Sequence, residues 1–447
     1  MSKIHFHGAS SVVTGSNFIL EDDTGSVLID LGIFQEDHKT ESENTKPLPF
    51  AVLSLSCVVI THAHLDHCGR LPLLAKEGYK GPIFMTPATK DIVEISLEDS
   101  ARIAERREEE DGIPPIFSMD DVTRVVELIQ TVEYETPVTH NSFTFIFRDA
   151  GHILGSATIE ITDSTGKKTI FSGDLGNSPQ DIIQPTTPIT AGNTAIIEST
   201  YGGQIHKNEG VYEILQHEIN EVEETNGVLL IPAFSIQRTQ EIIHRIGHLL
   251  RDKKINTNTP IYVDSPMAIR VTEVFKAYPN LYNTETAAEE TPFEFPTLIP
   301  TSEAHESKEI LKVDGPKVII AGSGMMNGGR IQFHLKNYGS RHNTRILIVG
   351  YQAENTLGRQ IENGEKRIVL FEEEVTIHAS ITKIESMSSH ADHPRLMKWL
   401  QSIEGLQTVC IVHGEDDRRQ ALAKDIQKVF PHVTTVLPTQ GQSIDLP

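Results

Sequence analysis

The stretch Thr61-His62-Ala63-His64-Leu65-Asp66-His67-Cys68-Gly69-Arg70 places three histidines and one aspartate within six positions. An apolar run, Val58-Val59-Ile60, precedes it and the helix-like Leu71-Pro72-Leu73-Leu74 follows it, which is typical of a strand, a tight connection and a helix. In the connection His62 and His64 can turn to one side, while Asp66 and His67 begin the helix and face a second position. Imidazole and carboxylate groups bind metals, so the stretch predicts two adjacent cation sites.

Four further apolar runs end in an acidic residue or a histidine. They are 27–29 before Asp30, 169–171 before Ser172-Gly173-Asp174, 195–197 before Glu198 and 410–412 before His413. Each run is typical of a buried strand. Ligands of layered α/β folds bind at the carboxyl ends of strands, so we expect these residues to share one site with the histidines of 62–67.

Two zinc ions need about four ligands each, with one ligand shared, so further ligands must come from these strand ends. The candidates are His152, which lies between Gly151 and Ile153-Leu154-Gly155, together with Asp174 and His413. Asp174 can bridge the ions, and Asp30 can orient the histidines as a hydrogen-bond acceptor. Paired cations lower the pKa of a shared water and neutralise an incoming oxyanion. The sequence therefore predicts a hydrolase with two Zn²⁺ per chain, although Mn²⁺ also suits this ligand set.

Length and composition limit the class of protein. A chain of 447 residues predicts two cores, or one core with a large insertion. A formal charge of −23 argues against a protein that coats nucleic acid nonspecifically. Three scattered cysteines, no apolar run of transmembrane length and no signal-like N-terminus lead us to expect a cytoplasmic protein without membrane contact.

The middle of the chain has its own pattern. Apolar runs at 228–231, 261–263, 318–321 and 346–349 alternate with helix-like segments, which predicts a second, parallel sheet. Helices are expected at 87–110, 211–224 and 237–250, and a long connection at 283–306. Residues 317–367 contain eight basic and three acidic side chains, which indicates either a solvated face or a local track for a polyanion.

The motifs resemble those of a known superfamily. Asp30, His62-x-His64-x-Asp66-His67, His152 and Asp174 resemble, in order, the four motifs of metallo-β-lactamases, whose members hydrolyse lactams, thioesters, lactones and phosphodiesters. Glu198-Ser199-Thr200-Tyr201-Gly202 and Ser388-Ser389-His390-Ala391-Asp392-His393 resemble motifs A and B of the β-CASP nucleases. His413 matches the histidine form of motif C, which is associated with the RNA-specific branch. The resemblance covers nearly all of the chain and extends to bacterial proteins similar to the nuclease subunit of the messenger-RNA 3′-end cleavage factor.

The resemblance implies an αβ/βα four-layer sandwich with an inserted α/β domain. The sandwich would comprise residues 1–205 and 368–447, and the β-CASP insertion, with a mainly parallel sheet, residues 206–367. It also implies the metal ligands: His62, His64, His152 and Asp174 for one zinc, and Asp66, His67, Asp174 and His413 for the other. Asp66, Glu198 and His390 would be catalytic, with His390 protonating the leaving 3′-oxygen. Substrate phosphates would be bound by Ser235, Arg238, Ser323, Gly324, Gly328 and Arg330.

The implied function is a zinc-dependent ribonuclease. A metal-bridging hydroxide would cleave single-stranded RNA, leaving 5′-phosphate and 3′-hydroxyl ends, by endonuclease or 5′–3′ exonuclease action. The family often forms homodimers, so a homodimer is compatible with the sequence. Three alternatives stay open: a hydrolase of small esters, thioesters or lactams, a non-catalytic RNA-binding scaffold, and a DNA-directed nuclease. The large middle domain argues against the first, the complete ligand set against the second and His413 against the third.

Overall fold

The computed structural model describes residues 2–35, 38–207, 210–353 and 355–447. The chain forms two compact units, one comprising Met1–Ile205 and Ser389–Pro447 and the other comprising His206–Ser388. The second unit thus extends past the expected boundary at residue 367, because β19 (Ser380–Lys383) pairs with a strand of that unit. Within the described residues, no helix combines the length and apolar character needed to cross a bilayer.

The first unit contains two seven-stranded sheets. One has the order β22 (Ser443–Asp445), β1 (Lys3–Phe6), β2 (Phe18–Asp22), β3 (Gly25–Ile29), β4 (Cys57–Val59), β5 (Ile83–Met85) and β6 (Ile129–Thr131). The other has the order β21 (Thr434–Val436), β20 (Thr408–Ile411), β11 (Thr194–Ile197), β10 (Lys168–Phe171), β9 (Ala157–Thr162), β8 (Phe143–Asp149) and β7 (Val138–His140). Both sheets have an antiparallel and a parallel half.

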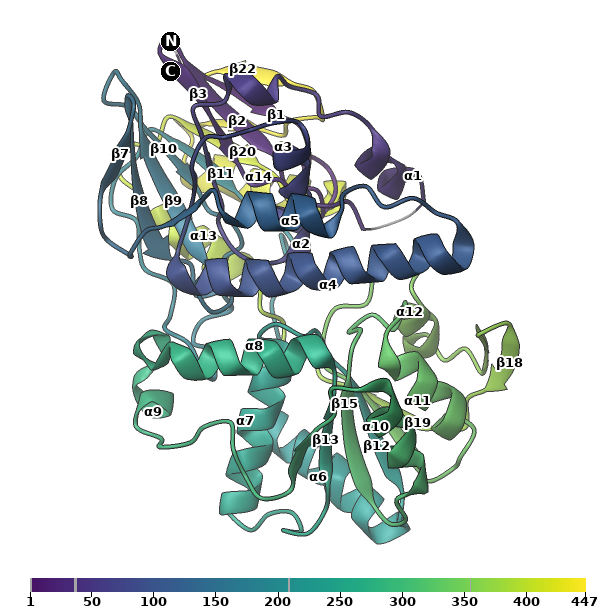
Figure 1. Cartoon of the computed structure of the whole chain (residues 1–447). Helices are drawn as coiled ribbons and strands as arrows, with labels where there is room; N and C mark the ends of the chain where they lie inside the picture. The colour runs from purple at the N-terminus through teal and green to yellow at the C-terminus, as the bar shows by residue number, and fades with distance from the viewer. Residues whose placement is uncertain (1, 36–37, 208–209, 354) are drawn as a thin grey trace. The chain divides into compact units, whose positions relative to one another are not determined.

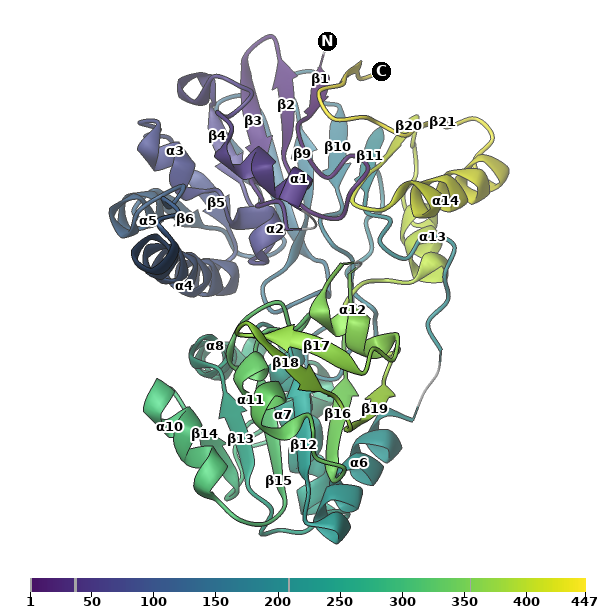
Figure 2. The ribbon, with the colours of Figure 1, turned by 90° about the vertical axis from the view of Figure 1, so that its right-hand side faces the viewer.

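The two sheets pack face to face. Alternate residues of β8, namely Phe143, Phe145 and Phe147, are fully buried in one apolar cluster with Val59 of the other sheet. A second cluster joins β20 to α13 (His393–Gln401) and α14 (Asp416–Val429) on the outer face. Figure 2 shows α3 (Pro72–Lys76), α4 (Pro87–Asp111) and α5 (Met119–Val126) outside the first sheet and α13 and α14 outside the second. The four-layer sandwich expected for this unit is confirmed.

Local sequence signals set the helix boundaries. The helix α4 begins where the Thr86 side chain accepts a hydrogen bond from the Thr89 amide and Pro87 occupies the first turn. It ends at Asp111 and is capped by Gly112, whose φ of 70° suits a residue without a Cβ atom. At α5, Ser118 and Asp121 form a reciprocal capping box. The helices expected at 87–110, 211–224 and 237–250 are confirmed as α4, α6 (Val211–Thr225) and α7 (Arg238–Arg251).

The second unit is built on a six-stranded sheet in which every pairing is parallel. Its order is β14 (Leu298–Pro300), β13 (Ile261–Asp264), β15 (Lys317–Ala321), β12 (Val228–Pro232), β16 (Thr344–Ile348) and β19. Besides α6 and α7, the α-helices of this unit are α8 (Pro266–Ala277), α9 (Thr284–Ala287), α10 (Ala304–Glu309), α11 (Arg330–Tyr338) and α12 (Leu357–Glu362). A hairpin is formed by β17 (Arg367–Leu370) and β18 (Glu373–Thr376). Figure 1 shows these elements around the sheet. The predicted parallel sheet is confirmed.

One expectation about this unit is wrong. The segment 283–306 is not only a connection, because it contains α9, the edge strand β14 and the start of α10. The strand is three residues long and ends in Pro300, and proline is tolerated at a sheet edge because an edge strand need not donate every ladder hydrogen bond. Such a short strand has too few residues to show an alternating pattern.

Candidate metal centre

Five strand ends of the first unit meet as the sequence predicts. β3 and β4 are parallel neighbours in one sheet, and β10, β11 and β20 are parallel neighbours in the other. Asp30, His62, Asp174, Glu198 and His413 follow these strands and are all at least 97% buried. Asp30 and His413 have φ values of 59° and 49°, in the left-handed region that is uncommon for residues other than glycine and that occurs at functional sites.

A first donor cluster contains His62, His64, His152 and Asp174. The Nδ1 atom of His64 lies 3.1 Å from Nε2 of His62 and 3.1 Å from Nε2 of His152. The Oδ2 atom of Asp174 lies 3.4 Å from Nε2 of His62 and 3.5 Å from Nε2 of His152. Ligands bound tetrahedrally to zinc at about 2.0–2.1 Å are separated by about 3.3 Å, so these four atoms fit one cation.

A second cluster contains Asp66, His67, Asp174 and His413. The Nε2 atom of His67 lies 3.2 Å from Nε2 of His413 and 3.3 Å from Oδ1 of Asp174. The Oδ2 atom of Asp66 lies 3.4 Å from Nε2 of His413. These donors also lie within 4.8 Å of one another, and they come from the helix α2 (Leu65–Cys68) and the ends of β10 and β20.

Asp174 belongs to both clusters, with one carboxylate oxygen directed to each. Among the described residues, neither oxygen accepts a hydrogen bond, although both are buried. A buried, unpaired carboxylate is costly unless a cation neutralises it. The residues present therefore fit two metal ions that share this carboxylate.

Partners on the other side of the imidazole rings fix their orientation. The Nδ1 atom of His67 lies 2.7 Å from Oδ2 of Asp30, and Asp30 also accepts hydrogen bonds from the amide and hydroxyl of Thr61. The Nδ1 atom of His413 lies 3.1 Å from Oγ1 of Thr200, and Nδ1 of His152 lies 3.3 Å from the carbonyl oxygen of Ser389. Such contacts select the ring tautomer and aim the remaining nitrogen at a metal.

Electrostatics favour the metal-binding protonation states at part of the centre. Burial, followed by the charge of a neighbouring histidine, lowers the pKa of His62 and His152 well below the ordinary value, which favours neutral, ligating imidazoles. Burial would raise the pKa of Asp174, but the neighbouring His413 and His67 hold it well below its usual range. The first cluster is therefore supplied with neutral imidazoles and an ionised carboxylate.

Gly32 lets the chain after β3 approach the backbone of Asp66 in α2. A Cβ atom at this position would lie 1.5 Å from the carbonyl oxygen of Asp66. The amide of Gly32 donates to the carbonyl of Ser16, while the amide of Ser16 donates to that same carbonyl of Asp66. The absence of a side chain at residue 32 thus helps to position Asp66 and His67.

We expect Gly32→Ala to weaken both stability and metal binding. The added methyl group must displace the backbone at Asp66, and overpacking of this kind costs about 1–3 kcal/mol. Thermal unfolding of metal-free protein and metal analysis by mass spectrometry measure the two effects. Gly247→Ala in α7 is the control, because its Cβ would make only an ordinary contact at 3.4 Å. Unchanged metal content and unfolding temperature in Gly32→Ala would contradict the prediction.

Glu198 and His390 form a polar pair beside Asp174. The Nδ1 atom of His390 lies 3.3 Å from each carboxylate oxygen of Glu198 and 3.8 Å from Oδ2 of Asp174. The amides of Leu175 and Thr200 donate to Glu198 at 2.7 and 3.3 Å and hold its carboxylate in place. Burial opposes protonation of His390, but the charges of Glu198 and then Asp174 raise its pKa to about 9. The imidazolium form, which can donate a proton, is thereby favoured.

The residues expected to bind substrate phosphates all lie in the second unit. Ser235 follows β12, and Ser323, Gly324 and Gly328 follow β15, so they lie at the carboxyl ends of adjacent parallel strands. The two arginines expected there contact acidic side chains of the second unit. Arg238 is buried in an ion pair with Glu241, and Arg330 donates to Asp264 at 2.6 Å.

The basic segment 317–367 is likewise engaged in ion pairs. Arg345 pairs with Glu218, Lys336 with Glu373 and Arg359 with Glu362. The idea of a track for a polyanion therefore receives no support from these side chains. The first two pairs join a helix of the second unit to a strand, and the third lies within α12.

Some supporting residues were not found from the sequence. Thr61 and Thr200 orient Asp30 and His413, and the carbonyl of Ser389 contacts His152. Thr61 and Thr200 lie inside the motifs quoted above, so their closeness in sequence to the expected ligands could have indicated this supporting role. A carbonyl contact leaves no signal in the side-chain pattern.

Comparison with known proteins defines the class of this chain. A metallo-β-lactamase superfamily domain matches residues 19–198, a β-CASP domain matches 239–361 and an RNA specificity domain of zinc-dependent metallo-hydrolases matches 374–438. A crystal structure of a protein of unknown function from Enterococcus faecalis V583 has the same fold, with a TM-score of 0.56, 13% identity and 99% of each chain covered. The class is a metallo-β-lactamase-fold hydrolase with a β-CASP insertion.

Relatives narrow this class further. Ribonuclease TTHA0252 of Thermus thermophilus is 35% identical, with 98% of this chain and 96% of the relative covered. An RNase J-like protein of Methanocaldococcus jannaschii is 31% identical, with 99% of both chains covered, and the transcription termination factor FttA of the same organism is 28% identical, with 97% and 70% covered. The chain therefore belongs to the β-CASP family of metal-dependent RNA nucleases.

Proposed function

We propose that this protein is a zinc-dependent ribonuclease that hydrolyses single-stranded RNA and leaves 5′-phosphate and 3′-hydroxyl ends. The observation that carries the proposal is the pair of donor clusters sharing Asp174, with the Glu198–His390 pair beside them. His62, His64, His152 and Asp174 would hold one Zn²⁺, and Asp66, His67, Asp174 and His413 the other. When bound, two such ions lower the pKa of a water molecule and neutralise phosphate charge.

The protein's own groups would handle the proton at the leaving oxygen. Glu198 holds Nδ1 of His390 at 3.3 Å, so the opposite ring nitrogen is the one that would face the substrate. As the oxygen of water joins phosphorus and loses a proton to solvent, the P–O3′ bond breaks and His390 would donate its own proton to the 3′-oxygen. Asp66, which lies on the solvent-facing side of the second cluster with 21% of its side chain exposed, would orient the attacking water.

The second unit would contribute phosphate contacts. We assign them to Ser235, Ser323 and the backbone of Gly324 and Gly328, because groups at the carboxyl ends of parallel strands commonly bind ligands. Arg238 and Arg330 would support the same loops through Glu241 and Asp264. A homodimer is compatible with this assignment and is not needed for it.

Zinc-loaded protein incubated with end-labelled RNA and DNA of the same sequence tests the proposal. We expect RNA to be cleaved and DNA to be left largely intact. The downstream fragments should carry 5′-phosphates, measured by their ligation to an oligonucleotide with a free 3′-hydroxyl. Protein with the His152→Ala substitution, prepared identically, controls for contaminating nucleases. Equal cleavage of DNA, or downstream fragments with 5′-hydroxyl ends, would refute the proposal.

A further inference from the structure

Two histidines of the second unit lie one helical turn apart. His244 and His248 occupy one face of α7, and their Nε2 atoms are 3.2 Å apart. The side chain of His244 is 3% exposed and that of His248 is 35% exposed. The spacing of four residues is one that lets two imidazoles on a helix bind one metal ion.

A carboxylate from a different element meets both rings. Glu289 follows α9, and its Oε1 atom lies 2.8 Å from Nε2 of His244 and 2.8 Å from Nε2 of His248. Ligands of one metal ion with bonds of about 2.0–2.1 Å are about 2.9–3.4 Å apart in octahedral or tetrahedral geometry. The triangle of donor atoms, with sides of 2.8, 2.8 and 3.2 Å, is close to one face of such a polyhedron.

Arg251 orients this carboxylate. Its guanidinium donates to Oε2 of Glu289 at 2.6 Å, so Oε1 is the oxygen directed at the histidines. Ligating carboxylates of metal sites are commonly hydrogen-bonded through their other oxygen in this way. The arginine also reduces the local negative charge, which favours a metal that imidazole binds well over a hard cation such as Ca²⁺.

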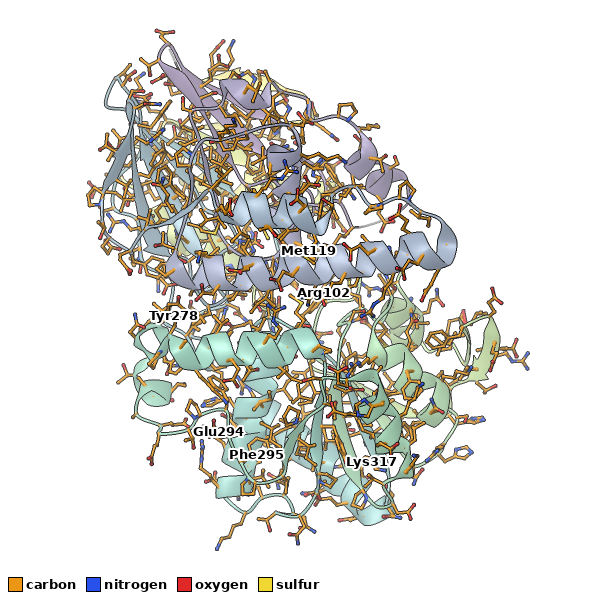
Figure 3. The ribbon with its side chains drawn as sticks, viewed as in Figure 1. Arg102, Met119, Tyr278, Glu294, Phe295 and Lys317 are labelled. Carbon is orange, nitrogen blue, oxygen red and sulfur yellow. The ribbon has the colours of Figure 1, made fainter. Side chains whose placement is uncertain are left out.

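The segment that carries Glu289 is fastened beside the same helices. Glu294 pairs with Lys276 of α8 at 2.9 Å, and Phe295 packs where Gly247 of α7 has no side chain. Figure 3 labels Glu294 and Phe295 in this connection. The three donors are therefore held by a helix and by an anchored segment, which reduces the entropy cost of binding a metal.

We propose that His244, His248 and Glu289 form a third metal-binding site, which takes a divalent transition-metal ion such as Zn²⁺. The protein supplies two imidazole nitrogens and one carboxylate oxygen, and water completes the coordination on the exposed side of His248. The ion cross-links α7 to the connection between α9 and β14. All of its ligands lie in the second unit, whereas the two donor clusters that share Asp174 lie in the first.

A hydrogen-bonded cluster without metal is the competing explanation, because two neutral imidazoles can both donate to Oε1. The substitution Glu289→Gln separates the two. Glutamine retains an oxygen that accepts hydrogen bonds, but its neutral amide is a poor ligand for zinc. A metal site should therefore be lost in this variant, while a hydrogen-bonded cluster should persist.

The experiment uses the full chain with Asp174→Ala, which disables the first centre. After equilibrium dialysis against micromolar Zn²⁺, metal per chain is measured by mass spectrometry, and thermal unfolding is measured with and without Zn²⁺. We expect about one ion per chain and a higher unfolding temperature with zinc. Adding Glu289→Gln or His248→Ala should remove both effects, with zinc affinity falling at least about tenfold. Adding His217→Ala, an exposed histidine on α6, should change neither.

Two results would overturn the proposal. One is equal zinc content in the Asp174→Ala protein with and without Glu289→Gln. The other is absence of zinc from the Asp174→Ala protein itself while its metal-free unfolding temperature matches that of the unsubstituted chain. The metal-free unfolding temperature of each variant distinguishes loss of the site from loss of the fold.

Discussion

The Asp174→Ala protein is expected to lose the ability to hold two metal ions and, with it, RNA cleavage. Asp174 directs one oxygen to each donor cluster, and neither oxygen has a hydrogen-bond partner among the described residues. Metal ions contribute several kcal/mol to the stabilisation of a transition state, and about 1.36 kcal/mol corresponds to a factor of ten. We therefore expect cleavage of end-labelled RNA to fall by about a thousandfold or more.

Asp445→Ala provides the control for this experiment. Asp445 is an exposed aspartate on β22 that pairs with Lys3, so its removal also deletes one carboxylate but leaves the centre intact. Metal per chain is measured in proteins that also carry Glu289→Gln, so that the proposed third site does not contribute to the number of ions. A protein with Asp174→Ala that keeps two ions per chain in this background would show that the shared carboxylate is not a ligand.

For His390→Ala we expect cleavage to be strongly reduced, as in Asp174→Ala, while metal content stays normal. His390 contacts Glu198 and lies 3.8 Å from Asp174, but it belongs to neither four-donor cluster. General acid catalysis contributes about 10²–10⁴-fold to a rate, so the loss on RNA should fall in that range. Rates on labelled RNA and metal analysis of the same sample measure both quantities.

The leaving group offers a sharper test of the role of His390. A p-nitrophenolate departs without being protonated, so bis(p-nitrophenyl) phosphate does not need a general acid. The His390→Ala protein should lose much less activity on this compound than on RNA. Equal losses on both substrates would show that His390 positions the substrate or the metal centre rather than donating a proton.

Much of the first unit could be predicted because its signals are local. The three histidines of the metal loop are close in sequence, and Asp30, Asp174 and His413 each follow an apolar run. The general rule that parallel strands present their carboxyl ends at one edge was sufficient to bring these residues together, and the distances agree. The resemblance of the motifs to a known family supplied the assignment of His390 and Glu198.

What could not be predicted depends on contacts between distant residues. The resemblance to a known family implied that Arg330 binds phosphate, but the sequence does not reveal its contact with Asp264, which lies 66 positions away and becomes a neighbour only in the folded sheet. The sequence does not predict a metal site at His244 and His248, because the third donor, Glu289, comes from a segment without a recognisable pattern. The extent of the second unit has a similar basis, since β19 joins its sheet through pairing with β16.

The first unit is assembled from two separated pieces of the chain, and this has a consequence for its biogenesis. Its first strand, β1, pairs with β22, and β20, which carries His413, inserts between β11 and β21. Ribosomes synthesise the whole of the second unit between these pieces. A nascent polypeptide therefore lacks His413 until the second unit has been translated, and the donor cluster of Asp66, His67, Asp174 and His413 can be completed only after that point.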